Sequence, residues 1–240
     1  MSNLNGKTIL VTGSNRGIGA AVVRELLKTG VKKIYAAARK TSSLPDFADP
    51  RIVPLALDVT DTATIAAAVK AAPDVDILLN NAGTAVFANF VDSPLDLIAG
   101  DMNTNYYGTL NVIRAFVPQF EARGAGTIVN TVSVVGLTSA PGLAGYSASK
   151  AALQSLTQTL RVTLKPKGIR VTGIYPGPID TDMARDIPMD KATPEHAAAE
   201  IIKGLEADQD YIFPDPVALH IGQLWATDGK ALDTALAGAE

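Results

Sequence analysis

A tyrosine and a lysine four residues apart, Tyr146 and Lys150, have types and a spacing that suit acid–base chemistry. In a helix this spacing puts both side chains on one face. A phenol with its ordinary pKa of about 10 transfers protons poorly at neutral pH, and a neighbouring ammonium group stabilises its phenolate form. Lys150 is placed to supply that charge. Because such a tyrosine often only packs in a core with its hydroxyl hydrated, a functional interpretation needs an independent ligand site.

A serine hydroxyl is the second group that could contact a reacting oxygen. Ser133 ends the apolar, β-branched run 126–133, which predicts a buried parallel strand. Open α/β sheets bind ligands at the carboxyl ends of their strands. We therefore expect the Ser133 hydroxyl to lie at such an edge.

A glycine-rich turn near the N-terminus supplies the independent site. Residues 7–12 predict an apolar strand, and an amphipathic helix is predicted to follow the turn and to stop at Gly30. Glycines let the backbone approach phosphate oxygens, and the free amides and dipole of a helix hold the charge. A tight turn alone would explain the glycines, but between a strand and a helix they predict phosphate binding. The turn consists of Gly13, Ser14, Asn15, Arg16, Gly17, Ile18 and Gly19.

The end of the second predicted strand, residues 33–38, favours NADP over NAD. In dinucleotide-binding folds, the adenosine ribose lies at the end of this strand. In NAD-binding proteins an acidic residue there binds the free 2′-hydroxyl. This chain has Ala38 there, followed by Arg39 and Lys40. A solvated loop would also explain the two basic residues, but Arg16 of the glycine turn is expected close by. We therefore expect a 2′-phosphate to be bound here.

Two further segments are predicted to border the nucleotide. Residues 51–58 predict a strand that ends at Asp58, an expected acceptor for an adenine amine, with Val59 after it. Residues 75–80 predict another strand, which leads into short polar residues and a glycine that suit a sharp bend beneath a nucleotide. Turn formation alone would explain this bend too. It consists of Asn80, Asn81, Ala82 and Gly83.

The rest of the chain continues the alternation of strands and helices. Its predicted helices are 62–72, 95–120, 146–164 and one from Pro194, and its later strands are 169–175 and 211–213. This order predicts an α/β fold with one doubly wound parallel sheet of six or seven strands and helices on both faces. We predict one domain over residues 1–240, with an irregular substrate lid at about 177–193. The apolar tail, 214–240, matches no pattern that we can assign.

Composition excludes several other classes of protein. The 240 residues are 47% hydrophobic with a net charge of −3, and the isoelectric point is about 5.4. We therefore expect a large core and no nucleic-acid or membrane partner. With no Cys and only two His, far apart in sequence, we predict no metal site. No apolar run is long enough for a membrane span, so the prediction is a soluble, cytoplasmic protein.

Taken together, these motifs resemble the short-chain dehydrogenase/reductase family over roughly residues 5 to 215. The matching elements are Thr12-Gly13-(x)3-Gly17-Ile18-Gly19, Asn80-Asn81-Ala82-Gly83, Asn105, Ser133, Tyr146-(x)3-Lys150 and Pro176-Gly177. Each element alone is weak, and their order at the family's spacings is specific. The resemblance implies a Rossmann-type sheet with about seven strands in the order 3-2-1-4-5-6-7.

The resemblance also implies roles for the site residues. Tyr146 would protonate a carbonyl oxygen as hydride arrives from nicotinamide, and Lys150 would lower the pKa of the phenol and bind the ribose. Ser133 would polarise the carbonyl, and Asn105 would hold a water that relays protons to Lys150. The nucleotide would also contact Asn81, Ala82, Gly83, Pro176, Gly177, Ile179 and Thr181. Family members commonly pair through two long helices, here 95–120 and 146–164, which implies a homodimer or homotetramer.

The implied function is NADPH-dependent reduction of a carbonyl compound, reversible as alcohol oxidation. An apolar ketone or aldehyde is the expected substrate, because the residues expected around the reacting carbon are mainly apolar. The exception is Arg185 in the lid, which its acidic neighbours neutralise or which stays solvated. The residues expected around the reacting carbon are Val135, Leu143, Pro176, Met183, Ile187 and Met189. One alternative is a 3-oxoacyl-carrier-protein reductase. Arg123 and Lys167 are candidates for docking its carrier, but an ordinary solvated face is the favoured explanation of these two residues. Another is a non-catalytic nucleotide sensor, which the intact Ser133, Tyr146 and Lys150 argue against.

Overall fold

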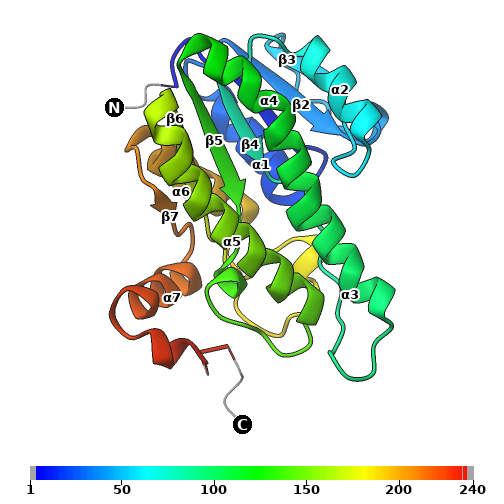
Figure 1. Cartoon of the computed structure of the whole chain (residues 1–240), viewed down its shortest axis with the longest axis vertical. Coiled ribbons are helices and arrows are strands. Elements are labelled where there is room, and N and C mark those ends of the chain that lie inside the picture. The colour runs from blue at the N-terminus through cyan, green and yellow to red at the C-terminus, as the bar shows by residue number, and fades with distance from the viewer. Residues whose placement is uncertain (1–3, 234, 237–240) are drawn as a thin grey trace.

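A computed structural model describes residues 4–233 and 235–236. Seven parallel strands form one sheet in the order β3-β2-β1-β4-β5-β6-β7 (Figure 1). This confirms the predicted strand order and the doubly wound architecture. The strands are β1 (Thr8–Thr12), β2 (Lys33–Ala38), β3 (Ile52–Ala56), β4 (Ile77–Asn80), β5 (Gly126–Thr131), β6 (Ile169–Ile174) and β7 (Tyr211–Ile212).

Helices cover both faces of the sheet and enclose a hydrophobic core on each side. On one face, α1 (Gly17–Leu27) and α6 (Pro194–Glu206) bury Val23, Leu26 and Ile201 against the strands. The other face carries α2 (Thr62–Ala71), α4 (Thr109–Arg123) and α5 (Ala144–Leu164). Strands such as β1 and β4 are buried along their whole length, which explains why they are apolar on both faces.

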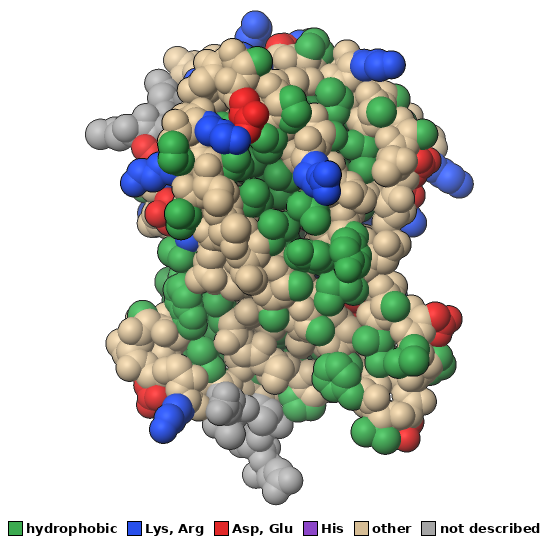
Figure 2. Space-filling model, in the orientation of Figure 1, with side chains coloured by type: hydrophobic (Ala, Val, Ile, Leu, Met, Phe, Trp, Pro, Cys, Tyr) green, Lys and Arg blue, Asp and Glu red, His purple; other side chains and the backbone are tan. Residues whose placement is uncertain are grey.

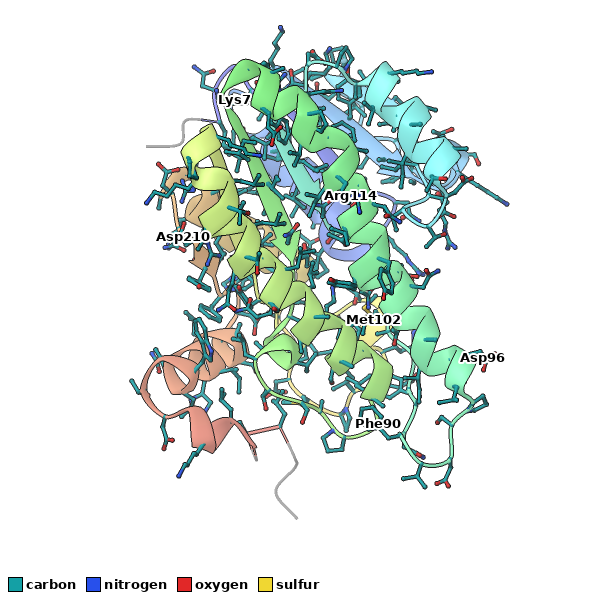
Figure 3. All side chains as sticks on the ribbon, in the orientation of Figure 1. Lys7, Phe90, Asp96, Met102, Arg114 and Asp210 are labelled. Atoms are coloured by element: carbon teal, nitrogen blue, oxygen red, sulfur yellow. The ribbon has the colours of Figure 1, made fainter. Side chains whose placement is uncertain are left out.

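The helical pattern predicted over residues 95–120 is wrong as a single α-helix. The structure has α3 (Leu95–Asp101), a π-helical segment over Met102–Gly108 and then α4. The π-helical segment packs beside α5, and Met102, labelled in Figure 3, marks where α3 ends. A side chain at Gly108 would collide with Val59, because its Cβ would lie 2.7 Å from Val59 Cγ2. The glycine therefore permits a close approach rather than merely interrupting a helix.

Several predicted strands are shorter in the structure than in the sequence pattern. The strand predicted at 51–58 spans Ile52–Ala56, that at 75–80 spans Ile77–Asn80, and that at 126–133 ends at Thr131. Ser133 thus lies two residues beyond β5, where the chain turns into the short 3-10 helix Val134–Gly136. Leu57, Val75 and Val132 lie just outside the strands but are buried in the hydrophobic clusters, so periodicity alone extends the strands too far.

The tail without an assignable pattern contains α7 (Pro216–Thr227), followed by a 3-10 helix over Gly229–Asp233. Asp215 starts α7, because its Oδ1 accepts a hydrogen bond from the backbone N–H of Ala218 (2.9 Å). The segment packs back on the sheet end: Leu232 is buried, and its carbonyl accepts a hydrogen bond from Thr138 Oγ1. Residues 234 and 237–240 of the tail lie outside the described residues.

The face that carries α4 and α5 presents hydrophobic side chains at its surface. Hydrophobic side chains spread across its centre in Figure 2, with charged side chains gathered mainly towards its top and margins. Val162 on α5 and Tyr107 beside α4 are among the exposed apolar residues. Within residues 4–233 and 235–236, no helix combines the length and the hydropathy that crossing a membrane requires.

Candidate active site

A cavity of about 1360 Å³ opens at the carboxyl ends of the strands. It extends from the glycine-rich turn to the lid and the end of α5, so it joins the predicted nucleotide and substrate regions. Most of the residues predicted from the sequence line it. They are Gly13, Asn15, Arg16, Gly17, Ile18, Arg39, Asp58, Val59, Asn81, Ala82, Gly83, Ser133, Val135, Leu143, Tyr146, Lys150, Pro176, Gly177, Ile179, Met183, Ile187 and Met189.

The glycine-rich turn has the tight geometry of a phosphate cradle. Gly13 adopts a φ of 68°, and a Cβ at this residue would lie 2.9 Å from the Cα of Ala82. At Gly19 a Cβ would lie 2.2 Å from the carbonyl oxygen of Gly13. The Ncap residue of α1, Arg16, makes no side-chain capping hydrogen bond. The first amides of α1 therefore face the cavity without a side-chain cap, as an anion site requires.

The bend after β4 is locked to this turn by hydrogen bonds. Thr12 Oγ1 accepts from the backbone N–H groups of Asn81 (2.9 Å) and Ala82 (3.0 Å). The side-chain amide of Asn81 donates from Nδ2 to the carbonyl oxygens of Thr12 (3.1 Å) and Gly13 (3.3 Å). These bonds fix two walls of the nucleotide end relative to one another.

Basic side chains border the end of β2, as the sequence predicts. Arg39 and Lys40 line the cavity together with Arg16, which forms a 3.4 Å ion pair with Asp182 of the lid. Both partners of this pair are more than half exposed, at 68% and 55%, so the pair contributes little stability. Asp58 accepts hydrogen bonds from the backbone N–H and the hydroxyl of Thr60, and the first of these bonds dominates in lowering the pKa of Asp58.

The hydroxyls of Tyr146 and Ser133 meet in the same cavity. Burial raises the pKa of Tyr146 to about 12, while a hydrogen bond with the Ser133 side chain opposes that rise. Ser133 Oγ also donates to the carbonyl oxygen of Pro176 (3.2 Å) and accepts from the backbone N–H of Val135 (3.4 Å). Ser133 is thus held in place at the end of β5, and Tyr146 remains a neutral phenol at neutral pH.

The expectation that Lys150 lowers the pKa of this phenol stays a prediction. Lys150 Nζ donates to the carbonyl oxygen of Thr131 (2.8 Å) and lies 5.5 Å from the centroid of the Tyr146 ring. Its ammonium is therefore held by a strand carbonyl and lies near the Tyr146 ring. Burial lowers the pKa of Lys150 itself to about 8, against the opposing charge of Asp101.

Asn105 lies behind the cavity wall, fully buried in the π-helical segment. Its Oδ1 accepts from the backbone N–H of Thr84 (2.9 Å), and its Nδ2 donates to Thr84 O (2.9 Å) and Ser149 Oγ (2.9 Å). Both amide hydrogens are thus used, and the side chain positions Thr84 and α5. A water relay at Asn105 stays a prediction.

Three other predicted cofactor residues do not line the cavity. Ser14 is buried, and its hydroxyl donates to the carbonyl oxygen of Val11 (2.7 Å). Gly19 lies in the first turn of α1 behind Gly13. Thr181 packs its methyl group near Gly17 and donates its hydroxyl to Ile179 O (3.2 Å). These three residues support the glycine-rich turn without lining the cavity.

The substrate end of the cavity is mainly apolar, with Leu143, Met183 and Ile187 among its walls. Arg185 is absent from the lining and forms a 2.6 Å ion pair with Asp182. Leu236 of the C-terminal tail also lines the cavity and packs in one cluster with Tyr146. Sequence reasoning missed this contribution because the tail carries no motif.

A buried carboxylate near the site was also missed. Asp101 ends α3 and accepts hydrogen bonds from Thr84 Oγ1 (2.7 Å) and the backbone N–H of Val86 (3.1 Å). One signal was present in the sequence: Asp101 lies four residues before Asn105, so both share a helical face.

The basic residues considered for carrier docking are far from the cavity mouth. Arg123 and Lys167 immediately precede β5 and β6, at the amino ends of these strands, whereas the cavity lies at the carboxyl ends (Figure 1). Lys167 pairs with Glu121 (2.5 Å), and Arg123 donates to the carbonyl oxygens of Pro73 and Val75. Their positions and partners agree with the ordinary solvated face that the sequence favours.

Comparisons with known proteins agree with this geometry. A family model described as short chain dehydrogenase matches residues 7–192. An NADP-dependent 3-hydroxy acid dehydrogenase from Schizosaccharomyces pombe is 33% identical over 196 residues, covering 77% of this chain and 76% of that protein. The oxidoreductase UcpA from Escherichia coli is 34% identical over 239 residues, covering 94% and 88%. A short chain dehydrogenase crystal structure from Burkholderia cenocepacia, in complex with NADP, has a TM-score of 0.92 and 36% identity, covering 99% and 100%.

Proposed function

Because this chain belongs to the short-chain dehydrogenase family, we propose that it reduces an apolar ketone or aldehyde to an alcohol with NADPH. The observation that carries the proposal is the pair of hydroxyls, Ser133 and Tyr146, in a cavity that joins a phosphate cradle to an apolar pocket. Such a pair can hold one carbonyl oxygen by two hydrogen bonds.

The residues of the nucleotide end fit NADP. Arg39 and Lys40 follow β2 where NAD-specific units carry an acid, and the α1 amides face the cavity. The Burkholderia structure contains NADP, and the fission yeast relative is named as NADP-dependent. When bound, this cofactor supplies the hydride. Arg39, Lys40 and Arg16 would hold its 2′-phosphate, and Gly13 to Gly17 its pyrophosphate.

Tyr146 is suited to act as the proton donor. Because burial keeps its pKa high, the phenol carries its proton at neutral pH and can give it to a developing alkoxide. Ser133, fixed by Pro176 and Val135, would orient the carbonyl oxygen. The nearby ammonium of Lys150 would favour the negative charge that remains on the phenol oxygen afterwards.

The chemistry of the substrate end favours a neutral substrate. Arg185 is paired with Asp182 and lies outside the lining, while the carboxylate of Asp186 lines this end, so a carboxylate substrate would meet negative charge there. The name of the fission yeast relative favours a 3-oxo acid as a second candidate. Steady-state assays of NADPH oxidation with neutral ketones, aldehydes and 3-oxo acids test the proposal. A kcat/KM that is highest for the acids would replace the first candidate with the second.

A further inference from the structure

Asp101 is a buried titratable group that the mechanism above does not use. It is 1% exposed, at the end of α3 where this helix passes into the π-helical segment. Met102, the next residue, is labelled in Figure 3 between the α3–α4 arm and the first half of α5. Burying a carboxylate is unfavourable unless hydrogen bonds or an opposite charge compensate it, so its position requires a physical explanation.

Two hydrogen bonds tie this carboxylate to the wall of the cavity. Asp101 Oδ1 accepts from the hydroxyl of Thr84 (2.7 Å), and Oδ2 accepts from the backbone N–H of Val86 (3.1 Å). Thr84 lines the cavity directly after the Asn81–Gly83 bend. Asp101 therefore fixes the chain segment that borders the reacting groups.

The same segment connects Asp101 with Lys150. A Cβ placed on Gly83 would lie 3.7 Å from Lys150 Nζ and 2.9 Å from Asn105 Oδ1. Asn105 bonds both to Thr84 and to Ser149, the residue before Lys150. The carboxylate thus binds Thr84 and the ammonium lies near the adjacent Gly83, and both Asp101 and Lys150 are buried, at 1% and 4% exposed.

Few charges compete in this region. Among the described residues, Lys150 on α5 is the charged side chain that acts on Asp101, and Asp101 is the charged side chain that acts on Lys150. Tyr146, also on α5, feels the charge of Asp101 as well. Low dielectric strengthens such an interaction compared with a pair at the surface.

We propose that Asp101 is a positioning residue that anchors Thr84 and Val86 beside the reacting groups and holds Lys150 in its ammonium form. Its buried negative charge offsets part of the cost of burying the lysine. The effect on turnover rests on the proposed function, whereas the effect on Lys150 does not.

The charge is tested first in the protein without substrate. Competitive acetylation with acetic anhydride, read at Lys150 by peptide mass spectrometry, gives the pH midpoint at which this amine becomes reactive. In Asp101→Asn, a near-isosteric change, the midpoint is expected to fall by about one pH unit, because an opposite charge is lost. An unchanged midpoint in a folded variant overturns the proposal.

Two controls separate charge from general disturbance. Asp215→Asn removes another buried carboxylate, which accepts from the backbone N–H groups of Gly177 (2.8 Å) and Ala218 (2.9 Å) and is not coupled to Lys150. Thr84→Val removes the hydroxyl contact and leaves the Asp101 charge. Neither is expected to move the Lys150 midpoint. If the Lys150 midpoint falls in either control variant as much as in Asp101→Asn, the charge of Asp101 is not the cause of the shift.

The coupling is reciprocal, which provides a test if Asp101→Asn does not fold. In Lys150→Met, the pKa of Asp101, followed by the ¹³C shift of its carboxyl, is expected to rise above the wild-type value by a similar amount. No rise overturns the proposal.

Turnover supplies the last measurement. For an active wild type, the alkaline limb of the kcat profile for ketone reduction should move to lower pH in Asp101→Asn, and Asp101→Glu should move it back. A limb that stays in place overturns the catalytic part of the proposal. A wild type inactive on every carbonyl substrate refutes the proposed function, while acetylation still decides the role of Asp101.

Discussion

The ammonium of Lys150 lies over the ring of Tyr146, 5.5 Å from its centroid, and donates its hydrogen bond to Thr131 O. This cation–π arrangement attracts the two side chains. Desolvation therefore dominates both groups: it raises the pKa of Tyr146 to about 12 and lowers that of Lys150 to about 8. A neutral phenol beside an ammonium is the protonation state that carbonyl reduction needs.

Removing the phenol hydroxyl should abolish most turnover and leave the cofactor site intact. Tyr146→Phe keeps the ring that packs beneath Lys150, so we expect kcat to fall by at least ~100-fold, as for the loss of a general acid. NADPH binding, measured by fluorescence titration, should change little. Near-wild-type turnover in this variant would show that another group donates the proton.

Burial of Lys150 should lower stability at neutral pH. Its pKa falls from 10.5 in the unfolded chain to about 8 in the folded one. Between these values the unfolded chain binds the proton that the folded chain releases, so the contribution of Lys150 to the free energy of unfolding rises with pH. At pH 7, Lys150→Met should therefore be more stable than wild type by about 1 to 3 kcal/mol.

Denaturant unfolding of both proteins across the pH range measures this difference. The difference in free energy of unfolding should shrink as pH rises above 8 and be small near pH 10.5. Near pH 10.5 the wild-type lysine is neutral in the folded state and is losing its proton in the unfolded state. A gap that is constant with pH would mean that packing, and not the charge of Lys150, separates the two proteins.

Cofactor preference should depend on Arg39. This side chain lines the nucleotide end of the cavity beside Lys40, and position 38 is an alanine. Arg39→Ala should weaken NADPH binding by about 1.5 to 3 kcal/mol through lost charged hydrogen bonds, and NADH binding much less. Calorimetric titration with each cofactor measures both values. Arg24→Ala, which instead removes an arginine stacked on Phe47, is the control. Equal losses for the two cofactors would exclude a 2′-phosphate contact.

The apolar face in Figure 2 should be an interface between two copies of the chain. Val162, on α5, is 75% exposed, and burying it against a second copy would remove its apolar surface from water. Val162→Glu should shift the protein from an oligomer towards a monomer without loss of helix content. Light scattering at micromolar concentration gives the mass. A wild-type mass of 25.0 kDa would exclude the interface.

Features set by short sequence spacing were predictable, and features set by tertiary packing were not. The glycine turn, the bend at Asn81 and the Tyr146–Lys150 pair depend on local geometry, so their motifs gave their positions. The direction of the Lys150 ammonium depends on Thr131, nineteen residues away in the chain and on another element. Burial of Asp101 likewise depends on how α3 meets Thr84. Periodicity cannot report either contact.

The C-terminal segment has one feature that local sequence predicts and one that depends on tertiary packing. Asp215 followed by Pro216 is a helix-start signal, and α7 does begin there. The contact of Leu236 with the cavity follows instead from the burial of Leu232 on the turn after Ser133, which no local pattern encodes.

A neutral aryl or alkyl ketone should be a better substrate than a 2-oxo acid of similar size. At the substrate end, the apolar walls meet two carboxylates, Asp182 and Asp186, and the Arg185 guanidinium is already paired with Asp182. A substrate carboxylate would lose its hydration and gain no unpaired cation there, so its kcat/KM should be at least ~10-fold lower under saturating NADPH. Because Arg185 is exposed and does not line the cavity, Arg185→Ala should leave this ratio unchanged. A higher kcat/KM for the acid that disappears in Arg185→Ala would show that the lid binds the charge, and that the ion pair with Asp182 opens to admit it.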